Sequence, residues 1–267
     1  MDGTVSTTIN IDIGTPQGSR ISPLLFCIMM ADLDLYTNQS GLINFADDTQ
    51  SIVVSDTKEE MIDVVKRESQ EIIKFFQGNN LVNNPDKLAL IHNSKGKTST
   101  ITFDNIGGQE VTSKTSDKLL GVSISSSLDW THHVDTLCGK LKQRLGMLRR
   151  IKHKIPRDKL KIVAEAIFNS KLRYAISVYL KPRLTEEDEQ SKDLQRLQVL
   201  QNDMIRLING KRRSQHTNMK ELRAEMKMMS VNQMTVYHAL LETFNIKNHG
   251  SVESIRQKLT APEAGPD

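Results

Sequence analysis

The spacing of the apolar residues changes at Trp130, and this change constrains the fold more than any other feature of the chain. Before Trp130, short β-prone runs and two helical stripes alternate with turn residues. After it, apolar residues recur every three or four positions over long stretches, which is typical of amphipathic helices. We therefore predict an α+β part over residues 1–129, an all-helical part over 130–249 and a disordered tail over 250–267.

Several elements of the first part can be predicted individually. A helix is expected from Ser22 to about Tyr36, because Ser22 is a good N-cap and Pro23 suits the first helical position. A second helix opens at the capping box Thr57–Glu60 and ends at Gly78. Strands are expected over 88–92, over 118–125 and on both sides of Gly107-Gly108.

The second part is expected to contain three longer helices and two shorter ones. The first carries an apolar stripe from Val134 to Leu148, the second follows Pro156, and the third is opened by Thr185 and closed by Gly210. The shorter helices are expected over 218–229 and 231–245. Because the apolar content of 37% is low, the core that these stripes can form is not large.

Two acids, Asp47 and Asp48, lie side by side between two apolar runs in "NFADDTQSIVV". The common interpretation is a hairpin, since Asp is favoured in turns. The alternative is a metal site, because both carboxylates can reach one point from a turn and hard divalent cations prefer oxygen ligands. Two such cations can clamp the attacking and leaving oxygens of a phosphoryl transfer. The stretch by itself is compatible with both.

The stretch "GTPQGS" places two glycines, Gly14 and Gly18, on either side of Pro16. Glycine lets the backbone approach a ligand closely, and Gln17 offers both a donor and an acceptor. A surface that touches a base or a sugar is one interpretation. A simple entry turn for the helix that follows is the other, and this fragment alone supports the two equally.

Positive charge is concentrated in the helical part. Between Gly139 and Arg183 there are fourteen lysines and arginines but only two acids, although the net charge of the chain is just +4. Such a concentration can hold a phosphate backbone. The residues predicted to contact the nucleic-acid backbone are Lys140, Lys142, Arg144, Arg149, Arg150, Lys152 and Lys154.

Other features exclude several classes of protein. No apolar run is long enough to span a bilayer, and the first ten residues lack the order of a signal peptide. Cys27 and Cys138 form neither a C-x-x-C pair nor a disulfide framework. We therefore expect an intracellular protein of the nucleus or cytoplasm with no membrane partner. His132 and His133 are expected to be surface or capping residues. The basic loop "GKRRSQH" is expected to be solvated, to touch phosphate or to signal nuclear import.

The stretches "GTPQGSRISPLLF", "NFADDT", "NNPDKLALI" and "KLLGVSISSSLDW" resemble, in order and spacing, four successive palm motifs of reverse transcriptases. They are most similar to those of non-LTR (LINE-type) retrotransposons. The resemblance covers about residues 5–180 and extends more loosely to about 245. It implies a partial polymerase palm over 1–129, with an antiparallel sheet and packed helices, followed by a basic, helical thumb over 130–249.

The resemblance also implies roles for individual residues. Asp47 and Asp48 match the acidic pair that binds catalytic magnesium, and Lys87 matches a lysine that assists the leaving pyrophosphate. The residues matching the nucleotide- and template-binding motifs are Gly14, Pro16, Gln17, Gly18, Ser19, Phe45 and Ala46. The primer-grip segment matches Leu120, Gly121 and Val122. The implied partners are an RNA template, a DNA primer and deoxynucleoside triphosphates.

One part of the family pattern has no counterpart here. The family's first catalytic aspartate lies on a palm strand well before the "PQG" loop, and neither Asp2 nor Asp12 stands in a matching context. The fingers are likewise not recognised. We therefore expect weak magnesium binding, little or no polymerisation by these 267 residues alone, and an unpaired sheet edge through which copies can associate.

Two further functions are compatible with the sequence. In the first, the chain is a non-catalytic nucleic-acid-binding remnant, with basic helices that grip a duplex and a relic acidic pair. In the second, residues 130–245 form a helical protein-interaction module without affinity for nucleic acid. Loss of chemistry when Asp47 and Asp48 are changed would distinguish the polymerase from the remnant, and salt-dependent binding would exclude the interaction module.

Overall fold

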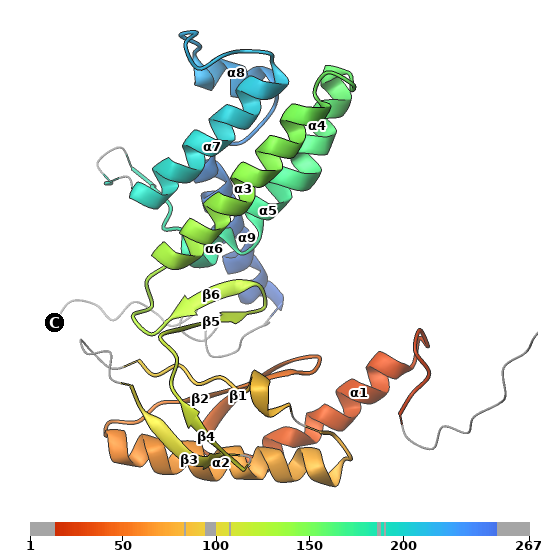
Figure 1. Ribbon diagram of the computed structural model, residues 1–267, viewed down its shortest axis with the longest axis vertical. Helices are drawn as coiled ribbons and strands as arrows, with labels where there is room; N and C mark the ends of the chain where they lie inside the picture. Colours follow the sequence, from red (N-terminus) through yellow and green to blue (C-terminus); the bar gives the residue numbers. More distant parts are fainter. Residues whose placement is uncertain are drawn as a thin grey trace, which may run out of the picture. The chain divides into compact units, whose positions relative to one another are not determined.

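The computed structural model describes residues 14–82, 84–93, 100–106, 108–185, 188–189 and 191–249. The chain divides into two compact units, which meet in the sequence between Thr115 and Ser116 (Figure 1). The described residues form many helices and three two-stranded antiparallel sheets. The predicted combination of antiparallel strands with packed helices is therefore confirmed.

The described residues of unit 1 form two α-helices and two hairpins. Helix α1 continues into a 3₁₀ turn over Asp32–Tyr36, and a short 3₁₀ turn over Pro85–Lys87 precedes the second hairpin. The remaining elements are α1 (Ser22–Ala31), β1 (Ser40–Phe45), β2 (Asp48–Val53), α2 (Lys58–Gly78), β3 (Thr102–Ile106) and β4 (Gln109–Thr112).

The two α-helices of unit 1 differ in how their N-termini are capped. The predicted cap of α2 is confirmed, since the side chain of Thr57 accepts a hydrogen bond of 3.3 Å from the N–H of Glu60. The predicted cap of α1 is wrong, because Ile21 occupies the N-cap position and Ser22 is the first helical residue. The Ser22 hydroxyl instead donates to the carbonyl of Pro16 at 3.0 Å, so it closes the preceding loop.

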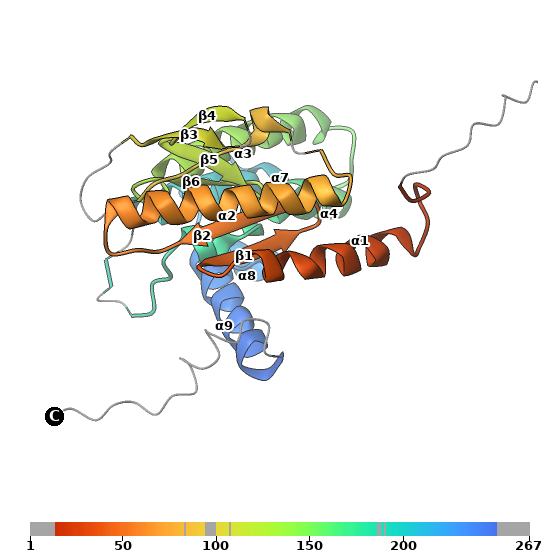
Figure 2. The same ribbon diagram turned by 90° about the horizontal axis from the view of Figure 1, so that it is seen from below.

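Helix α2 lies between the two hairpins of unit 1, as Figure 2 shows. On one side, Phe75 is buried with Met30 of α1 and Leu33 of the 3₁₀ turn after it, and Leu42 of β1 packs against this cluster. On the other side, Met61 and Val65 pack against the buried side chains of β3 and β4. Burial on two sides explains why the long amphipathic stripe of α2 is stable as a helix.

The strand predicted over 88–92 is wrong. Only Ile91 forms a β-bridge, with Lys114, and the N–H of Lys114 donates to the carbonyl of Leu90 at 2.8 Å. A strand needs a hydrogen-bonded neighbour along its whole length. Strand β4 ends at Thr112, before Lys114, the residue that pairs with Ile91. The segment therefore pairs at one point alone.

The described residues of unit 2 form a helical bundle and one hairpin. A π-helical turn over Glu165–Asn169 connects α4 to α5. The remaining elements are β5 (Ser116–Leu119), β6 (Val122–Ser125), α3 (Thr131–Ile151), α4 (Arg157–Ala164), α5 (Ser170–Arg173), α6 (Ile176–Tyr179), α7 (Lys192–Ile208), α8 (Met219–Glu225) and α9 (Val231–His249).

A single apolar cluster forms the core of unit 2. It joins the stripe of α3, for example Leu141 and Leu148, to the stripe of α7, for example Leu197 and Met204. Phe168 of the π turn is fully buried among them. The three predicted helical stripes are thus confirmed as the source of this core.

The third long helix begins later than predicted. Helix α7 starts at Lys192, after the side chain of Ser191 caps it, and not at Thr185. The carboxylate of Asp188 instead accepts hydrogen bonds of 2.8 Å from the N–H groups of Leu184 and Thr185. These bonds satisfy the backbone in a turn, which competes with helix formation.

The single strand predicted over 118–125 is wrong, because Leu120 and Gly121 turn the chain back on itself. Both have positive φ, 45° and 86°, as a tight two-residue hairpin turn requires. The resulting β5–β6 hairpin packs against α3, where the N–H of Ser123 donates to Nδ1 of His133 at 3.1 Å. The hairpin therefore belongs to the helical unit, and the compact units divide before residue 129.

Candidate functional site

Asp47 and Asp48 lie at the tip of the β1–β2 hairpin. Phe45 pairs with Asp48, so Ala46 and Asp47 form the two-residue turn and Asp48 opens β2. The predicted hairpin is confirmed. Ala46 has a φ of 52°, a conformation that costs free energy for a residue with a Cβ atom.

No basic side chain in the described part of the chain forms an ion pair with either acid. Both side chains are exposed, and neither carboxylate forms a hydrogen bond or ion pair with another residue in the described part of the chain. Across the same residues, no three His, Cys, Asp or Glu side chains gather at a point that could hold a metal ion. Adjacent carboxylates whose oxygens are not engaged by other residues can serve as ligands for a hard divalent cation.

The two faces of this hairpin differ in burial. Alternation along the strands places Ile43, Phe45, Asp48 and Ile52 on one face, and all four are exposed. The opposite face carries Leu42, which packs into the core of unit 1. Asp48 therefore shares an open face with three large apolar side chains, which is an unusual surface for a soluble protein.

The loop before α1 is closed by its own hydrogen bonds. The N–H of Ser19 donates to the carbonyl of Pro16 at 3.2 Å, next to the bond from Ser22 described above. Gly14 and Gly18 have φ values of 98° and 81°, which a residue with a side chain rarely adopts. A Cβ at either glycine would meet no atom within 4 Å, so conformation alone explains the glycines in this structure. Gln17 is exposed between them.

Lys87 ends the 3₁₀ turn over Pro85–Lys87 and is exposed. Two bonds fix this turn. The side chain of Asn84 accepts from the N–H of Asp86 at 3.1 Å, and Nε2 of Gln109 donates to the carbonyl of Pro85 at 2.7 Å. The turn thus holds a lysine that has no ion pair with any residue in the described ranges.

The segment Leu120–Val122 is held by the helices of unit 2. The phenol of Tyr174 donates a hydrogen bond to the carbonyl of Leu120, and the side chain of Val122 is buried. His133, which was expected to be a surface or capping residue, is also buried, because its imidazole accepts the Ser123 N–H and packs on the ring of Tyr179, with 4.8 Å between the ring centres. Its position in the first turn of α3, facing the hairpin, was not evident from the sequence.

The predicted phosphate-binding residues do not share one surface. At 100° per residue, Lys140 and Arg144 of α3 lie on one face, whereas Lys142 and Arg149 lie on the nearly opposite face. Arg144 donates to the carbonyl of Ile167 and so stabilises the π turn. Of the remaining residues, Arg150 is on α3, and Lys152 and Lys154 follow its last turn.

The face of α3 with Lys140 is joined by two cations that lie elsewhere in the sequence. The pKa of Lys171 is lowered, first by burial and then by repulsion from Lys140, Arg144 and Lys118. Lys118 lies on β5, outside the basic stretch, so charge counting along the sequence does not find it. Recognition of the hairpin turn at Gly121 would have placed Lys118 near the helices.

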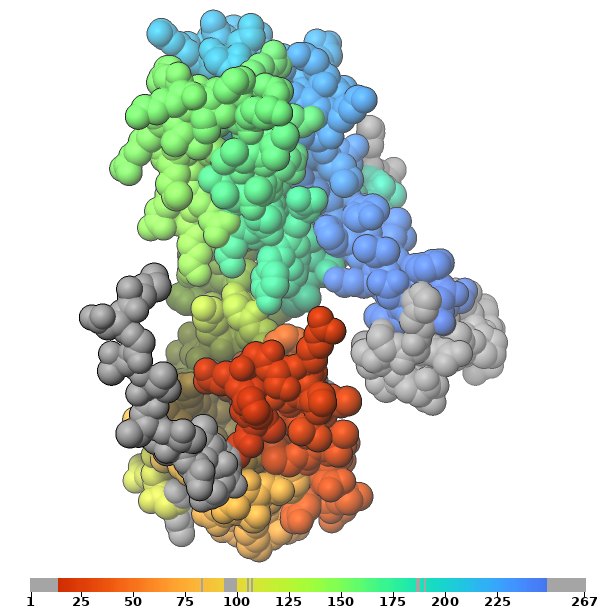
Figure 3. All heavy atoms as spheres, turned by 90° about the vertical axis from the view of Figure 1, so that its right-hand side faces the viewer, coloured from red at the N-terminus to blue at the C-terminus, as the bar shows by residue number. Residues whose placement is uncertain are grey.

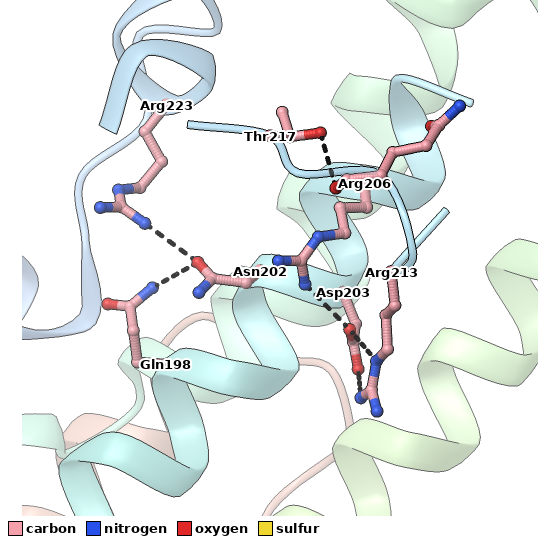
Figure 4. A network of polar contacts seen from close by, with 8 residues as sticks. Gln198, Asn202, Asp203, Arg206, Arg213, Thr217 and Arg223 are labelled. Atoms are coloured by element: carbon pink, nitrogen blue, oxygen red, sulfur yellow. Dashed lines mark hydrogen bonds and ion pairs between the residues drawn. The ribbon is translucent and has the colours of Figure 1, made fainter. Parts of the chain in front are cut away.

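The basic loop over 210–216 is partly structural, as Figure 4 shows. The buried carboxylate of Asp203 accepts hydrogen bonds from Arg213, at 2.7 Å for Nε, and from Arg206 at 3.4 Å. Asn202, which precedes Asp203 in α7, accepts from Gln198 and from Arg223, both at 2.9 Å. Arg213 therefore fixes the loop on α7 and is not free to bind phosphate.

Comparison with known proteins agrees with the four motifs. Residues 1–124 match the family described as reverse transcriptase (RNA-dependent DNA polymerase). The chain is 27% identical to the "RNA-directed DNA polymerase from mobile element jockey" of Drosophila funebris, over 78% of this chain and 23% of that protein. The chain thus corresponds to less than a quarter of that relative. No solved structure matches it significantly.

These matches confirm the resemblance to reverse transcriptases of non-LTR retrotransposons. The matched residues 1–124 include the acidic pair, the Lys87 turn and the β5–β6 turn. No helix among the described residues is long and apolar enough to cross a membrane.

Proposed function

We propose that this chain is part of an RNA-directed DNA polymerase of a non-LTR retrotransposon, with a palm segment in unit 1 and a thumb in the helices of unit 2. The single observation that carries the proposal is the hairpin tip with two exposed, unpaired and adjacent carboxylates. In the reaction, the 3′-hydroxyl of a DNA primer attacks the α-phosphorus of a deoxynucleoside triphosphate, and pyrophosphate leaves. An RNA strand is the template.

The residues of the hairpin fit magnesium. Asp47 and Asp48 provide hard oxygen donors that are not engaged elsewhere in the described residues, as this ion prefers. Magnesium, when bound, supplies positive charge that offsets the charge of the reacting phosphate. Phe45 and Ala46 position the tip, and Lys87 stabilises the negative charge of the departing pyrophosphate.

The template loop and the primer grip have complementary roles in this proposal. Gly14, Pro16, Gln17, Gly18 and Ser19 form a closed, exposed loop whose backbone can approach the template and the incoming nucleotide. Leu120, Gly121 and Val122 form the turn that supports the primer end, and the basic residues of α3 hold the duplex by its phosphates.

Metal binding at the hairpin can be tested independently of polymerisation. Iron(II) replaces magnesium at oxygen sites and, with ascorbate and peroxide, cleaves the backbone beside them. We expect cleavage next to residues 47 and 48 that magnesium suppresses and that Asp47→Asn, Asp48→Asn abolishes. The matched control is Asp32→Asn, Asp34→Asn, which removes two exposed acids outside the hairpin. Cleavage that is equal in both double variants would refute the metal site.

We also propose that the polypeptide of residues 1–267 extends a primer poorly by itself, since the family uses three carboxylates and the hairpin supplies two. Primer extension on an RNA template with magnesium tests this directly. We expect no product, together with retained binding of an RNA–DNA hybrid. Strong extension that disappears in the Asp47→Asn, Asp48→Asn variant would overturn this part and show that a third carboxylate is present.

The non-catalytic nucleic-acid-binding remnant remains the second candidate. It is favoured by the basic residues of α3, which are largely exposed and do not depend on the hairpin. Under this alternative, hybrid binding falls steeply with salt while iron-mediated cleavage at residues 47 and 48 is absent. A helical protein-interaction module would instead show no binding of nucleic acid at all.

A further inference from the structure

A small cavity lies in unit 2 where the β5–β6 hairpin meets α3 and α5. Its volume of about 60 Å³ is far below the roughly 300–1,000 Å³ of sites that hold a whole nucleotide or drug. It can therefore accept one small group. The residues that line it are Lys118, Gly121, Ser123, His133, Thr136, Leu137, Lys140 and Lys171.

The charge of this lining has one sign. Three lysines, Lys118, Lys140 and Lys171, come from three different elements, and the lining contains no Asp or Glu. None of the three forms an ion pair with another residue in the described ranges. The nearest acid in the sequence, Asp117, accepts a hydrogen bond of 2.7 Å from the backbone N–H of Lys118. Repulsion from Lys140 and Lys118 adds to burial in disfavouring the charged form of Lys171, and an anion bound between the three lysines would relieve this repulsion.

His133 lines the cavity with a neutral side chain. Because its Nδ1 accepts the N–H of Ser123, the neutral imidazole carries its hydrogen on Nε2, where it is a donor. Its pKa is lowered, first by burial and then by repulsion from Lys171 and Lys140. The imidazole thus brings neither a negative charge nor an acceptor that would compete with a bound anion.

The hairpin holds this arrangement in place. The Tyr174 phenol donates to the carbonyl of Leu120, and Nζ of Lys171 lies 5.3 Å from the centre of the Tyr174 ring. Gly121 approaches the same ring, since a Cβ there would lie 3.5 Å from Cε1 of Tyr174. The lysine on α5 and the turn of the hairpin are therefore fixed by one side chain.

We propose that this cavity binds a single phosphate group of a nucleic-acid backbone, held by Lys118, Lys140 and Lys171. The inference rests on the proposed function, since it places a backbone phosphate beside the segment Leu120–Val122. Size excludes a whole nucleotide, and the absence of an acid in the lining excludes a metal cation. A free phosphate or pyrophosphate has the same chemistry, so the test must separate the two sources.

The first experiment measures binding of a labelled RNA–DNA hybrid to the full chain at several salt concentrations. The test variant is Lys118→Gln, Lys140→Gln, Lys171→Gln. The control is Lys211→Gln, Lys220→Gln, Lys227→Gln, which removes the same charge from exposed positions of unit 2. We expect the test variant to lose at least about tenfold more affinity than the control. We also expect its slope of log K against log salt to decrease by about 0.9 more than that of the control, which corresponds to one phosphate.

Equal losses in the two triple variants, with salt-dependent binding otherwise intact, would overturn the cavity while the proposed function stands. If the hybrid does not bind the unmodified chain, both fail. Should the triple variant not fold, Lys118→Gln alone changes an exposed strand residue and gives the same comparison against Lys220→Gln.

The second experiment identifies the source of the phosphate. The lowered pKa of Lys171 makes its amine reactive towards a limiting amount of acetic anhydride. We expect the hybrid to protect Lys171, and inorganic phosphate or pyrophosphate at the same concentration to leave it reactive. Equal protection by free phosphate would overturn the assignment to a nucleic-acid backbone, and no protection by any of them would overturn the cavity as an anion site.

Discussion

At the scale of single residues, two buried polar side chains connect elements that the sequence does not link. Glu68 of α2 is only 3% exposed, yet its carboxylate accepts bonds from the N–H groups of Asn38 and Gln39, at 3.1 and 3.2 Å, and from the hydroxyl of Ser40 at 2.9 Å. It thereby fixes the start of β1, and hence the hairpin that carries the acidic pair. Burial raises the pKa of Glu68, but these hydrogen bonds outweigh it and the pKa is lowered overall.

Glu68→Ala should destabilise unit 1, because it leaves two backbone N–H groups without an acceptor. We expect a loss of about 1–3 kcal/mol in chemical denaturation followed by circular dichroism. Asp63→Ala, which removes an exposed acid from the same helix, serves as the control. Since the folded pKa lies below the unfolded one, the contribution of Glu68 is present above the unfolded pKa and is lost as the pH falls through the folded pKa. An unchanged stability in the Glu68 variant would contradict this role.

His133 makes the stability of unit 2 depend on pH in the same direction. Its pKa is lowered in the folded state, so the unfolded chain binds the proton more readily as the pH falls below about 6.5. We expect the melting temperature to decrease between pH 7.5 and 5.5, and this decrease to be smaller in His133→Gln. His132→Gln changes the exposed neighbour and should retain the full pH dependence. Identical pH profiles for the two variants would show that burial of His133 does not control it.

At the scale of elements, tight turns decide where the strands end. Both the β1–β2 and the β5–β6 hairpins contain a residue with a side chain at positive φ, Ala46 and Leu120. Apolar spacing carries no information about such a turn, so a single strand was expected over 118–125. Gly121 indicates a turn in the sequence only if Leu120 before it is assumed to adopt an unfavourable conformation with positive φ.

Leu120→Asn should stabilise the β5–β6 hairpin, because Asn-Gly is the preferred pair for this turn whereas leucine at a φ of 45° is strained. We expect a gain of about 1 kcal/mol in the free energy of unfolding. Gly121→Ala should have the opposite sign, because its φ is 86°. Denaturation curves of the two variants check the prediction, and a destabilised Leu120→Asn variant would contradict it.

At the scale of the whole molecule, each compact unit has its own core. The large cluster of unit 2 is separate from the two smaller clusters of unit 1. In Figure 3 the residues of α1, coloured red, lie at the surface of unit 1, and Leu24 and Ile28 are 61% and 59% exposed. Unit 1 therefore leaves part of its apolar surface exposed, and unit 2 does so on α9, where Leu240 and Phe244 are 64% and 58% exposed.

Phe168→Ala should destabilise unit 2 alone. The side chain is fully buried in the cluster of unit 2, so its loss should cost about 3–5 kcal/mol. Hydrogen exchange followed by mass spectrometry should show faster exchange in α3 and α7, with α2 unchanged. Met147→Ala, at a side chain that is 54% exposed, is the control. Faster exchange throughout both units would show that their cores unfold together.

The open hairpin of unit 1 should also affect association. Strands β1 and β2 pair only with each other in the described part of the chain, so each leaves one edge unpaired. We expect the sedimentation coefficient to rise with protein concentration, and Ile52→Lys, at a half-exposed position of β2, to reduce this rise. A monomer at all concentrations would exclude the edge as a contact.

The sequence by itself determined the order of the motifs, the helical stripes, the acidic hairpin and the resemblance to reverse transcriptases. These features depend on local spacing, which one helix or one hairpin satisfies without the rest of the chain. Only the tertiary structure decided that Lys118 meets Lys140 and Lys171, that His133 is buried, and that Arg213 is bound to Asp203. Such contacts join residues far apart in the chain, and their free energy depends on burial and on neighbouring charges that exist only in the folded protein.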